Sequence, residues 1–145
     1  MYTRRAEGQY LHDEVLRKIY DLIAIALDVS PESLNEIHQY KRGACGILRY
    51  MRYSPYTAEE RGKLVLPHYG GGHTDSCAIT LLFRQPVAAL QIKDPQSGDW
   101  KWVKPMDDAV TVNAGDVLSI LTGGYIKSTI HRVGRCRARF EVREH

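Results

Sequence analysis

The sequence predicts a mainly β fold in which two amino-terminal helices pack on a double-sheet core, either a β-sandwich or a jelly roll. Two observations predict it. Apolar residues between Tyr10 and Leu27 recur at helical spacing, whereas after Gly43 the chain changes to short apolar runs separated by turn residues. Short runs with tight connections are typical of antiparallel double-sheet folds. We therefore expect helical support over residues 1–42 and a jelly-roll core over residues 43–145, together forming one structural domain.

The first predicted element is an amphipathic helix over residues 10–27. Its apolar residues lie on one face, with charged residues between them. A second, shorter helix should follow, because Ser30 is a suitable N-cap residue and Pro31 suits the first helical turn. This helix should run through Leu34 and Ile37.

Short runs after residue 43 predict the strands of the core, because turn-forming residues such as Ser54-Pro55 and Gly123-Gly124 separate them. Residues 113–116 should form a turn between two strands, in which Asp116 hydrogen-bonds to backbone amides. The expected strands cover residues 46–53, 80–83, 88–92, 101–103, 109–112, 117–121, 127–133 and 137–142.

Charge and composition exclude several classes of function. The net charge of +3 comes from 20 basic and 17 acidic residues that are spread along the chain, so no concentrated basic face predicts binding to nucleic acid or a membrane surface. No apolar run approaches the ~20 residues that a membrane-spanning helix needs. The three cysteines (Cys45, Cys77 and Cys136) lack CxxC spacing, which favours a reduced, cytoplasmic setting. A small molecule is the expected partner.

Three residues form a candidate metal site. His73 and Asp75 are two residues apart, so in an extended segment both side chains point to the same face. His131, in a later run of strand character, offers a third ligand. Two imidazoles and one carboxylate form the facial triad that suits iron(II) oxygenase chemistry. The alternative is that His73 caps a glycine turn, Asp75 is a surface acid and His131 is a strand histidine, since six histidines produce such triplets by chance.

Several further motifs accompany this triplet in a specific order. They are LRYMRYSP (residues 48–55), GHTDSCAITLL (72–82), ALQI (89–92), WKWV (100–103), VNAGDVL (112–118) and STIHRV (128–133). In this order and spacing the chain resembles the 2-oxoglutarate/iron(II)-dependent dioxygenase superfamily. The similarity is to the branch related to isopenicillin N synthase, with its fungal secondary-metabolism members.

The resemblance implies a double-stranded β-helix, or jelly roll, braced by one long and one short helix. It also implies an enzyme in which iron(II), held by His73, Asp75 and His131, works with 2-oxoglutarate and O2. The expected reaction is oxidation of a small organic substrate, of the secondary-metabolite kind, at a C–H bond.

In the family, an arginine after the second iron histidine pairs with the distal carboxylate of 2-oxoglutarate. Bidentate guanidinium geometry suits that task. The resemblance makes Arg137 or Arg139 the candidate here, while the alternative is that these residues are solvated. Tyr53 resembles the tyrosine that borders the co-substrate and would donate its hydroxyl to the oxoglutarate carboxylate, although a buried core tyrosine is the alternative.

The chain departs from the family in two ways. The family's arginine belongs to an Arg-x-Ser motif, which has no matching serine here, and relatives carry longer segments at both ends. We therefore expect a shortened chain of marginal stability and weak activity. The alternative function is a truncated, non-catalytic jelly roll that binds metal or a small acid without turnover. A zinc hydrolase with the same ligands is a weaker alternative, because no general base is evident nearby.

Overall fold

The computed structural model describes residues 4–42, 46–52, 59, 71–85 and 87–134. The chain divides into two compact units, Met1–Pro55 and Tyr56–His145. We call them the helical unit and the β unit and describe each by itself. The sequence-based boundary at residues 42 and 43 stays a prediction.

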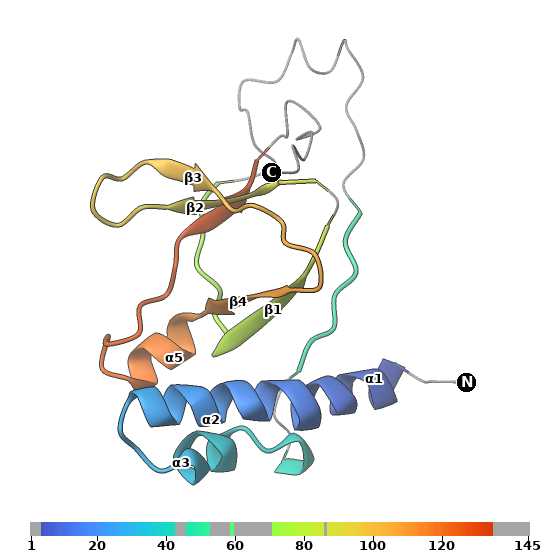
Figure 1. Ribbon diagram of the computed structural model, residues 1–145, viewed down its shortest axis with the longest axis vertical. Coiled ribbons are helices and arrows are strands. Elements are labelled where there is room, and N and C mark those ends of the chain that lie inside the picture. The colour runs from blue at the N-terminus through green and yellow to red at the C-terminus, as the bar shows by residue number, and fades with distance from the viewer. Residues whose placement is uncertain (1–3, 43–45, 53–58, 60–70, 86, 135–145) are drawn as a thin grey trace. The chain divides into compact units, whose positions relative to one another are not determined.

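The helical unit begins with the predicted amphipathic helix (Figure 1). It consists of α1 (Arg4–Tyr10), a π-helical stretch η1 (Leu11–Leu16) and α2 (Arg17–Ala26), so it starts earlier than the sequence indicated. Asp28 ends it in the left-handed conformation, with φ of 56°. The Asp28 N–H donates to Ile25 O (3.1 Å) and the Val29 N–H to Ala24 O (3.0 Å), which is a Schellman motif.

The second predicted helix is α3 (Pro31–Ile37), followed by a short 3-10 helix η2 (Tyr40–Arg42). Ser30 occupies the N-cap position as predicted, but its hydroxyl contacts the Glu32 carboxylate and makes no side-chain cap bond. Tyr20 and Ala24 of α2 and Leu34 of α3 are buried. These side chains form the core of the helical unit.

The expected strand over residues 46–53 is wrong for the part that the structure describes. Residues 46–52 form no strand, and Ile47 is 80% exposed. No strand of the described residues pairs with this segment, so its β-branched and aromatic composition alone does not produce a strand.

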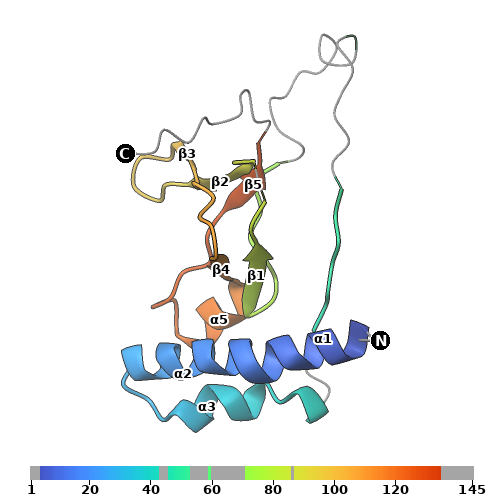
Figure 2. The ribbon, with the colours of Figure 1, turned by 45° about the vertical axis from the view of Figure 1, so that its right-hand side comes forward.

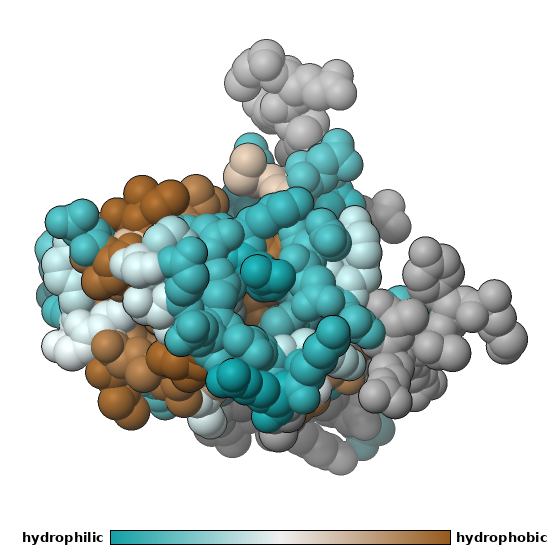
Figure 3. Space-filling view, turned by 90° about the horizontal axis from the view of Figure 1, so that it is seen from below, coloured by the Kyte–Doolittle hydropathy of each residue, from teal (hydrophilic) through white to brown (hydrophobic). Residues whose placement is uncertain are grey.

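In Figure 3, hydrophilic residues cover most of the visible surface and hydrophobic residues gather in separate patches. None of the described helices is long and apolar enough to cross a bilayer.

The described residues of the β unit form two antiparallel sheets (Figure 1, Figure 2). One pairs β1 (Ile79–Phe83) with β4 (Val110–Ala114), and the other has the order β3-β2-β5. The strands of this second sheet are β2 (Leu90–Lys93), β3 (Trp100–Trp102) and β5 (His131–Val133). The predicted double-sheet jelly-roll class is therefore confirmed. The expected strand at residues 137–142 lies outside the described residues.

The register of β1 and β4 separates a wholly apolar face from a face that carries the polar residues of the pair. Ile79 faces Ala114 and Leu81 faces Val112, whereas Thr80 lies opposite Asn113. Successive strand residues alternate between faces, so Thr80 and Asn113 share the face opposite to that of Leu81 and Val112. The polar face contributes to the candidate site below.

Residues 117–121 form a helix where a strand was expected. Helix α5 (Asp116–Leu121) begins directly after β4, so residues 113–116 join a strand to a helix and not two strands. The apolar residues Val117, Ile120 and Leu121 fit helical spacing as well as a strand, and so short an apolar run does not distinguish the two. Asp116 in the first turn is favourable at a helix amino terminus. The expected strand at residues 127–133 is also shorter, since β5 covers only its last three residues.

A tight turn joins β2 to β3. The Asp94 carboxylate accepts hydrogen bonds from the N–H groups of Gln96 (2.8 Å) and Ser97 (3.0 Å), and it also pairs with Lys101. These contacts lower the pKa of Asp94, the Lys101 hydrogen bond contributing most. Gly98 adopts φ of 75°, which glycine accommodates without strain.

Candidate metal centre

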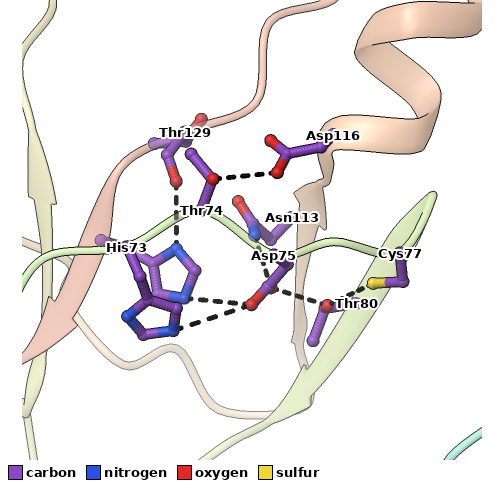
Figure 4. A network of polar contacts seen from close by, with 9 residues as sticks. His73, Thr74, Asp75, Cys77, Thr80, Asn113, Asp116 and Thr129 are labelled. Carbon is purple, nitrogen blue, oxygen red and sulfur yellow. Dashed lines mark hydrogen bonds and ion pairs between the residues drawn. The ribbon is translucent and has the colours of Figure 1, made fainter.

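The structure brings His73, Asp75 and His131 together. One donor atom from each residue lies within 4.8 Å of the other two. Nε2 of His73 is 3.8 Å and Nε2 of His131 is 3.6 Å from Oδ1 of Asp75. Both histidines therefore direct the same ring nitrogen toward the same carboxylate oxygen. Figure 4 shows His73 beside Asp75 and the residues that surround that carboxylate.

His131 is held firmly by its strand. Its side chain is only 15% exposed, and its Nδ1 lies 3.0 Å from the carbonyl oxygen of Thr129. A carbonyl oxygen only accepts, so Nδ1 carries the proton. The Nε2 lone pair is then free for a metal ion, which is the usual role of such a hydrogen bond on a ligating histidine.

His73 is placed mainly by its backbone. It forms an isolated bridge with His131, in which the His73 N–H donates to His131 O (3.0 Å) and the His131 N–H to His73 O (2.9 Å). The His73 side chain is 59% exposed. Among the described residues, its Nδ1 has no hydrogen-bond partner.

The residue before His73 is a glycine because an indole occupies the space that a side chain would need. A Cβ on Gly72 would lie 2.5 Å from Cη2 of Trp100. The Arg132 guanidinium lies 3.8 Å from the centre of the same indole, and its Nε donates to Oε1 of the buried Gln91 (2.9 Å). The backbone entering the metal site therefore packs directly on β3.

Asp75 is held through its other oxygen. Oδ2 accepts hydrogen bonds from Oγ1 of Thr80 (2.7 Å) and Nδ2 of Asn113 (2.9 Å). Burial raises the pKa of the Asp75 carboxyl, but these two hydrogen bonds and the charges of His131 and His73 hold that pKa below its ordinary value of 3.8. The residue is therefore anionic at neutral pH, as a metal ligand must be.

Helix α5 fixes the turn that follows Asp75. The N–H groups at a helix amino terminus lack partners within the helix. Here the Asp116 N–H donates to Asp75 O (2.7 Å) and the Val117 N–H to Cys77 O (3.3 Å). A Cβ on Gly115 would overlap Cys77 O and lie 2.7 Å from Asp75 O, so this close approach requires glycine.

Asp116 has a different partner from the one expected. Its Oδ2 accepts a hydrogen bond from Oγ1 of Thr74 (3.0 Å), which lies between the two candidate ligands. The expected bonds to backbone amides are not found among the described residues. The carboxylate instead supports the ligand segment, because the helix that begins at Asp116 is packed against that segment.

The donor set fits a metal ion of the iron(II) kind. Two imidazole nitrogens and one carboxylate oxygen form the facial arrangement that leaves coordination positions open. Ligands at ~2.1 Å on adjacent positions would be about 3 Å apart. The separations of 3.6 and 3.8 Å are somewhat larger. Binding would therefore draw the three donors closer together.

Other residues predicted for the site lie outside the described residues. They are Tyr53, Arg137 and Arg139, the candidates for binding 2-oxoglutarate. A cavity of about 550 Å³ is lined by residues 93–98 and 127–130, which include none of the three metal-ligand candidates. Sequence reasoning assigned no role to Thr80 and Asn113, although both lie within the quoted motifs. The register of β1 with β4 places them opposite each other, and both donate to Oδ2 of Asp75.

The family profile described as the 2OG-Fe(II) oxygenase superfamily matches residues 43–143. The chain belongs to this superfamily. The resemblance inferred from the motif order is thus confirmed. Two fungal proteins are similar in sequence to much of the chain. The 2-oxoglutarate-dependent dioxygenase citB of Monascus ruber is 37% identical over 117 residues, which are 79% of this chain and 34% of the relative. The clavatol oxidase claD of Penicillium crustosum is 32% identical over 115 residues, which are 79% of this chain and 33% of the relative.

A solved structure supports the fold. The crystal structure of a full-length Neurospora crassa protein in complex with alpha-KG superposes with a TM-score of 0.68 and 29% identity, covering 88% of this chain and 37% of that chain. The chain therefore spans about a third of the length of these three proteins.

Proposed function

We propose that the chain carries the catalytic site of an iron(II)- and 2-oxoglutarate-dependent oxygenase that oxidises a small organic substrate at a C–H bond. The observation that carries the proposal is the convergence of two histidine Nε2 atoms on one oxygen of Asp75. In a member of this superfamily, that donor set is best explained as the iron site.

Each residue of the triad has a separate role in this proposal. His131 offers a lone pair on Nε2, because its Nδ1–H donates to Thr129 O. Asp75 supplies the one negative charge, and His73 completes the face. When bound, iron(II) supplies the redox chemistry that couples oxidation of 2-oxoglutarate by O2 to oxidation of the substrate.

The co-substrate would be held by residues beyond those described. We propose Arg137 or Arg139 for the distal carboxylate of 2-oxoglutarate, since a guanidinium binds a carboxylate in a bidentate manner. Tyr53 is proposed as a hydroxyl donor to the same co-substrate. A small secondary metabolite is the proposed substrate class, supported by the fungal oxidases among the relatives. The cytoplasm is the proposed location.

An anaerobic titration tests the proposal. Adding iron(II) and then 2-oxoglutarate to the chain should produce the weak visible charge-transfer band of the iron chelate. Admitting air together with ascorbate, which reduces the second oxygen atom to water when no substrate is present, should convert 2-oxoglutarate to succinate and CO2. Asp75→Ala should abolish both signals, because it removes the anionic ligand. Asp107→Ala is the matched control, since this exposed carboxylate pairs with Arg84.

Two outcomes would count against the proposal. A band without succinate would support the non-catalytic alternative, in which the chain binds metal or a small acid without turnover. Activity that depends on zinc and not on iron would support a hydrolase instead.

A further inference from the structure

The two oxygens of the Asp75 carboxylate have different surroundings. Oδ2 accepts hydrogen bonds from Thr80 Oγ1 (2.7 Å) and Asn113 Nδ2 (2.9 Å). Oδ1 faces Nε2 of both histidines at 3.6 and 3.8 Å, beyond hydrogen-bond distance. One oxygen is therefore already engaged by the protein, and the other is directed toward the point where the histidines converge.

The strand register explains why two donors reach one oxygen. Thr80 in β1 and Asn113 in β4 are directly opposite each other in an antiparallel pair. Side chains at such positions lie on the same face, with Cβ atoms about 4.5–5.5 Å apart. The neighbouring pair Leu81 and Val112 lies on the other face. This cross-strand pair is thus a rigid support for the carboxylate.

A further contact fixes the direction of the Thr80 hydroxyl. A threonine hydroxyl has one hydrogen, and here it is donated to Asp75. The thiol of Cys77, 3.2 Å from Thr80 Oγ1, must then donate to that oxygen. Turning the hydroxyl toward another acceptor would break its hydrogen bond to Asp75.

We propose that Thr80 and Asn113 are positioning residues that make Asp75 a one-oxygen metal ligand through Oδ1. The inference rests on the proposed function, because it takes the triad to be a metal site. A carboxylate that binds through both oxygens occupies two coordination positions. Holding Oδ2 on the sheet leaves that second position open, as a co-substrate that chelates the metal requires.

The test compares metal binding by the 145-residue chain and its variants, with cobalt(II) as the probe. Thr80→Val keeps the shape of the side chain and removes the donor, and Asn113→Ala removes the other. Partners of metal ligands typically contribute ~10–100-fold to affinity. We expect each variant to bind cobalt(II) about 10–100-fold more weakly. The visible absorption spectrum should also change, because its intensity reports the coordination number.

Two controls separate positioning from general stability. Thr111→Val makes the same chemical change on β4, at a residue with no hydrogen bond to Asp75. It should bind cobalt(II) like the unsubstituted chain. Thr80→Ser restores a hydroxyl and should recover affinity and spectrum. A residue with a merely structural role would lower the melting temperature and leave the cobalt spectrum unchanged.

The outcomes distinguish this inference from the proposed function. Cobalt(II) affinity and spectrum that are unchanged in both variants would overturn the positioning role, even if the chain consumes 2-oxoglutarate. Weaker binding and an altered spectrum, in a chain that makes no succinate, would support the positioning role and contradict the oxygenase. A chain that binds no metal would overturn both.

Discussion

His131 and His73 present the same ring nitrogen to Asp75, but the protein holds them in different ways. His131 belongs to β5, is 15% exposed and is hydrogen-bonded at Nδ1. The His73 side chain is 59% exposed, and its placement depends on a backbone bridge and on the packing of Gly72 against Trp100. One half of the site is therefore organised before metal binds, and the other depends more on the metal.

The largest expected effect is a loss of metal affinity, and it should be equal for the two histidines. His131→Ala and His73→Ala should each weaken metal binding by ~100-fold or more, since even indirect partners of ligands contribute ~10–100-fold. Isothermal calorimetry with cobalt(II) or iron(II) measures it. His38→Ala is a control, because His38 lies in the helical unit and its ring stacks on Tyr20. A variant of either triad histidine that binds metal normally would remove that residue from the site.

A substitution at Gly72 tests the placement of His73, the less firmly held of the two histidines. Gly72→Ala would place a Cβ 2.5 Å from Cη2 of Trp100. Overpacking of this kind typically costs about 1–3 kcal/mol. We expect a free energy of unfolding lower by about that amount, and weaker metal binding because the His73 backbone shifts. Denaturant unfolding and calorimetry measure the two effects. Gly46→Ala, where a Cβ would meet no atom within 4 Å, should change neither.

Metal-free stability should separate the two histidines. His131→Ala removes a partly buried, hydrogen-bonded ring and should destabilise the metal-free chain by about 1–2 kcal/mol. His73→Ala removes an exposed ring and should stay within about 0.5 kcal/mol of the unsubstituted chain. Denaturant unfolding without metal provides the comparison. Equal losses in both variants would show that His73 is held as firmly as His131.

The smallest expected effect concerns the turn beside β2, the strand that pairs with β5. Asp94→Ala removes a carboxylate that accepts bonds from Gln96, Ser97 and Lys101, so the melting temperature should fall slightly at neutral pH. The pKa of Asp94 is lowered in the folded chain, so its contribution is present above the ordinary value of 3.8. This contribution to stability is lost as the pH falls below 3.8 and through the lowered pKa that Asp94 has in the folded chain. The difference in melting temperature between the two chains should therefore shrink on acidification.

The sequence predicted which candidate ligands would meet better than it predicted the residues that support them. The convergence of His73, Asp75 and His131 was expected because a motif fixes residue type and spacing, which are properties of the chain itself. The roles of Thr80 and Asn113 depend on which residues face each other across two strands, 33 positions apart in sequence, and single-sequence patterns do not specify register. Tyr53, Arg137 and Arg139 lie outside the described residues, so their roles stay predictions.

The errors in the fold have a common cause. Residues 117–121 and 46–52 were assigned to strands from short apolar runs, which fit more than one conformation. The first is a helix whose amino terminus bonds to the turn after Asp75, and the second pairs with no described strand. The first outcome depends on tertiary contacts that a short sequence window does not contain. The helix expected over residues 10–27 was predicted because its periodicity extends over several turns, and the second because Ser30 and Pro31 mark a helix start.

The short segment from His73 to Asp75 also has a mechanical meaning. At one end its backbone is bonded to β5, and at the other it is bonded to the beginning of α5 and, through the carboxylate, to β1 and β4. This segment therefore links the β1–β4 sheet to the β3-β2-β5 sheet, so any shift of one sheet relative to the other would change the spacing of His73, Asp75 and His131.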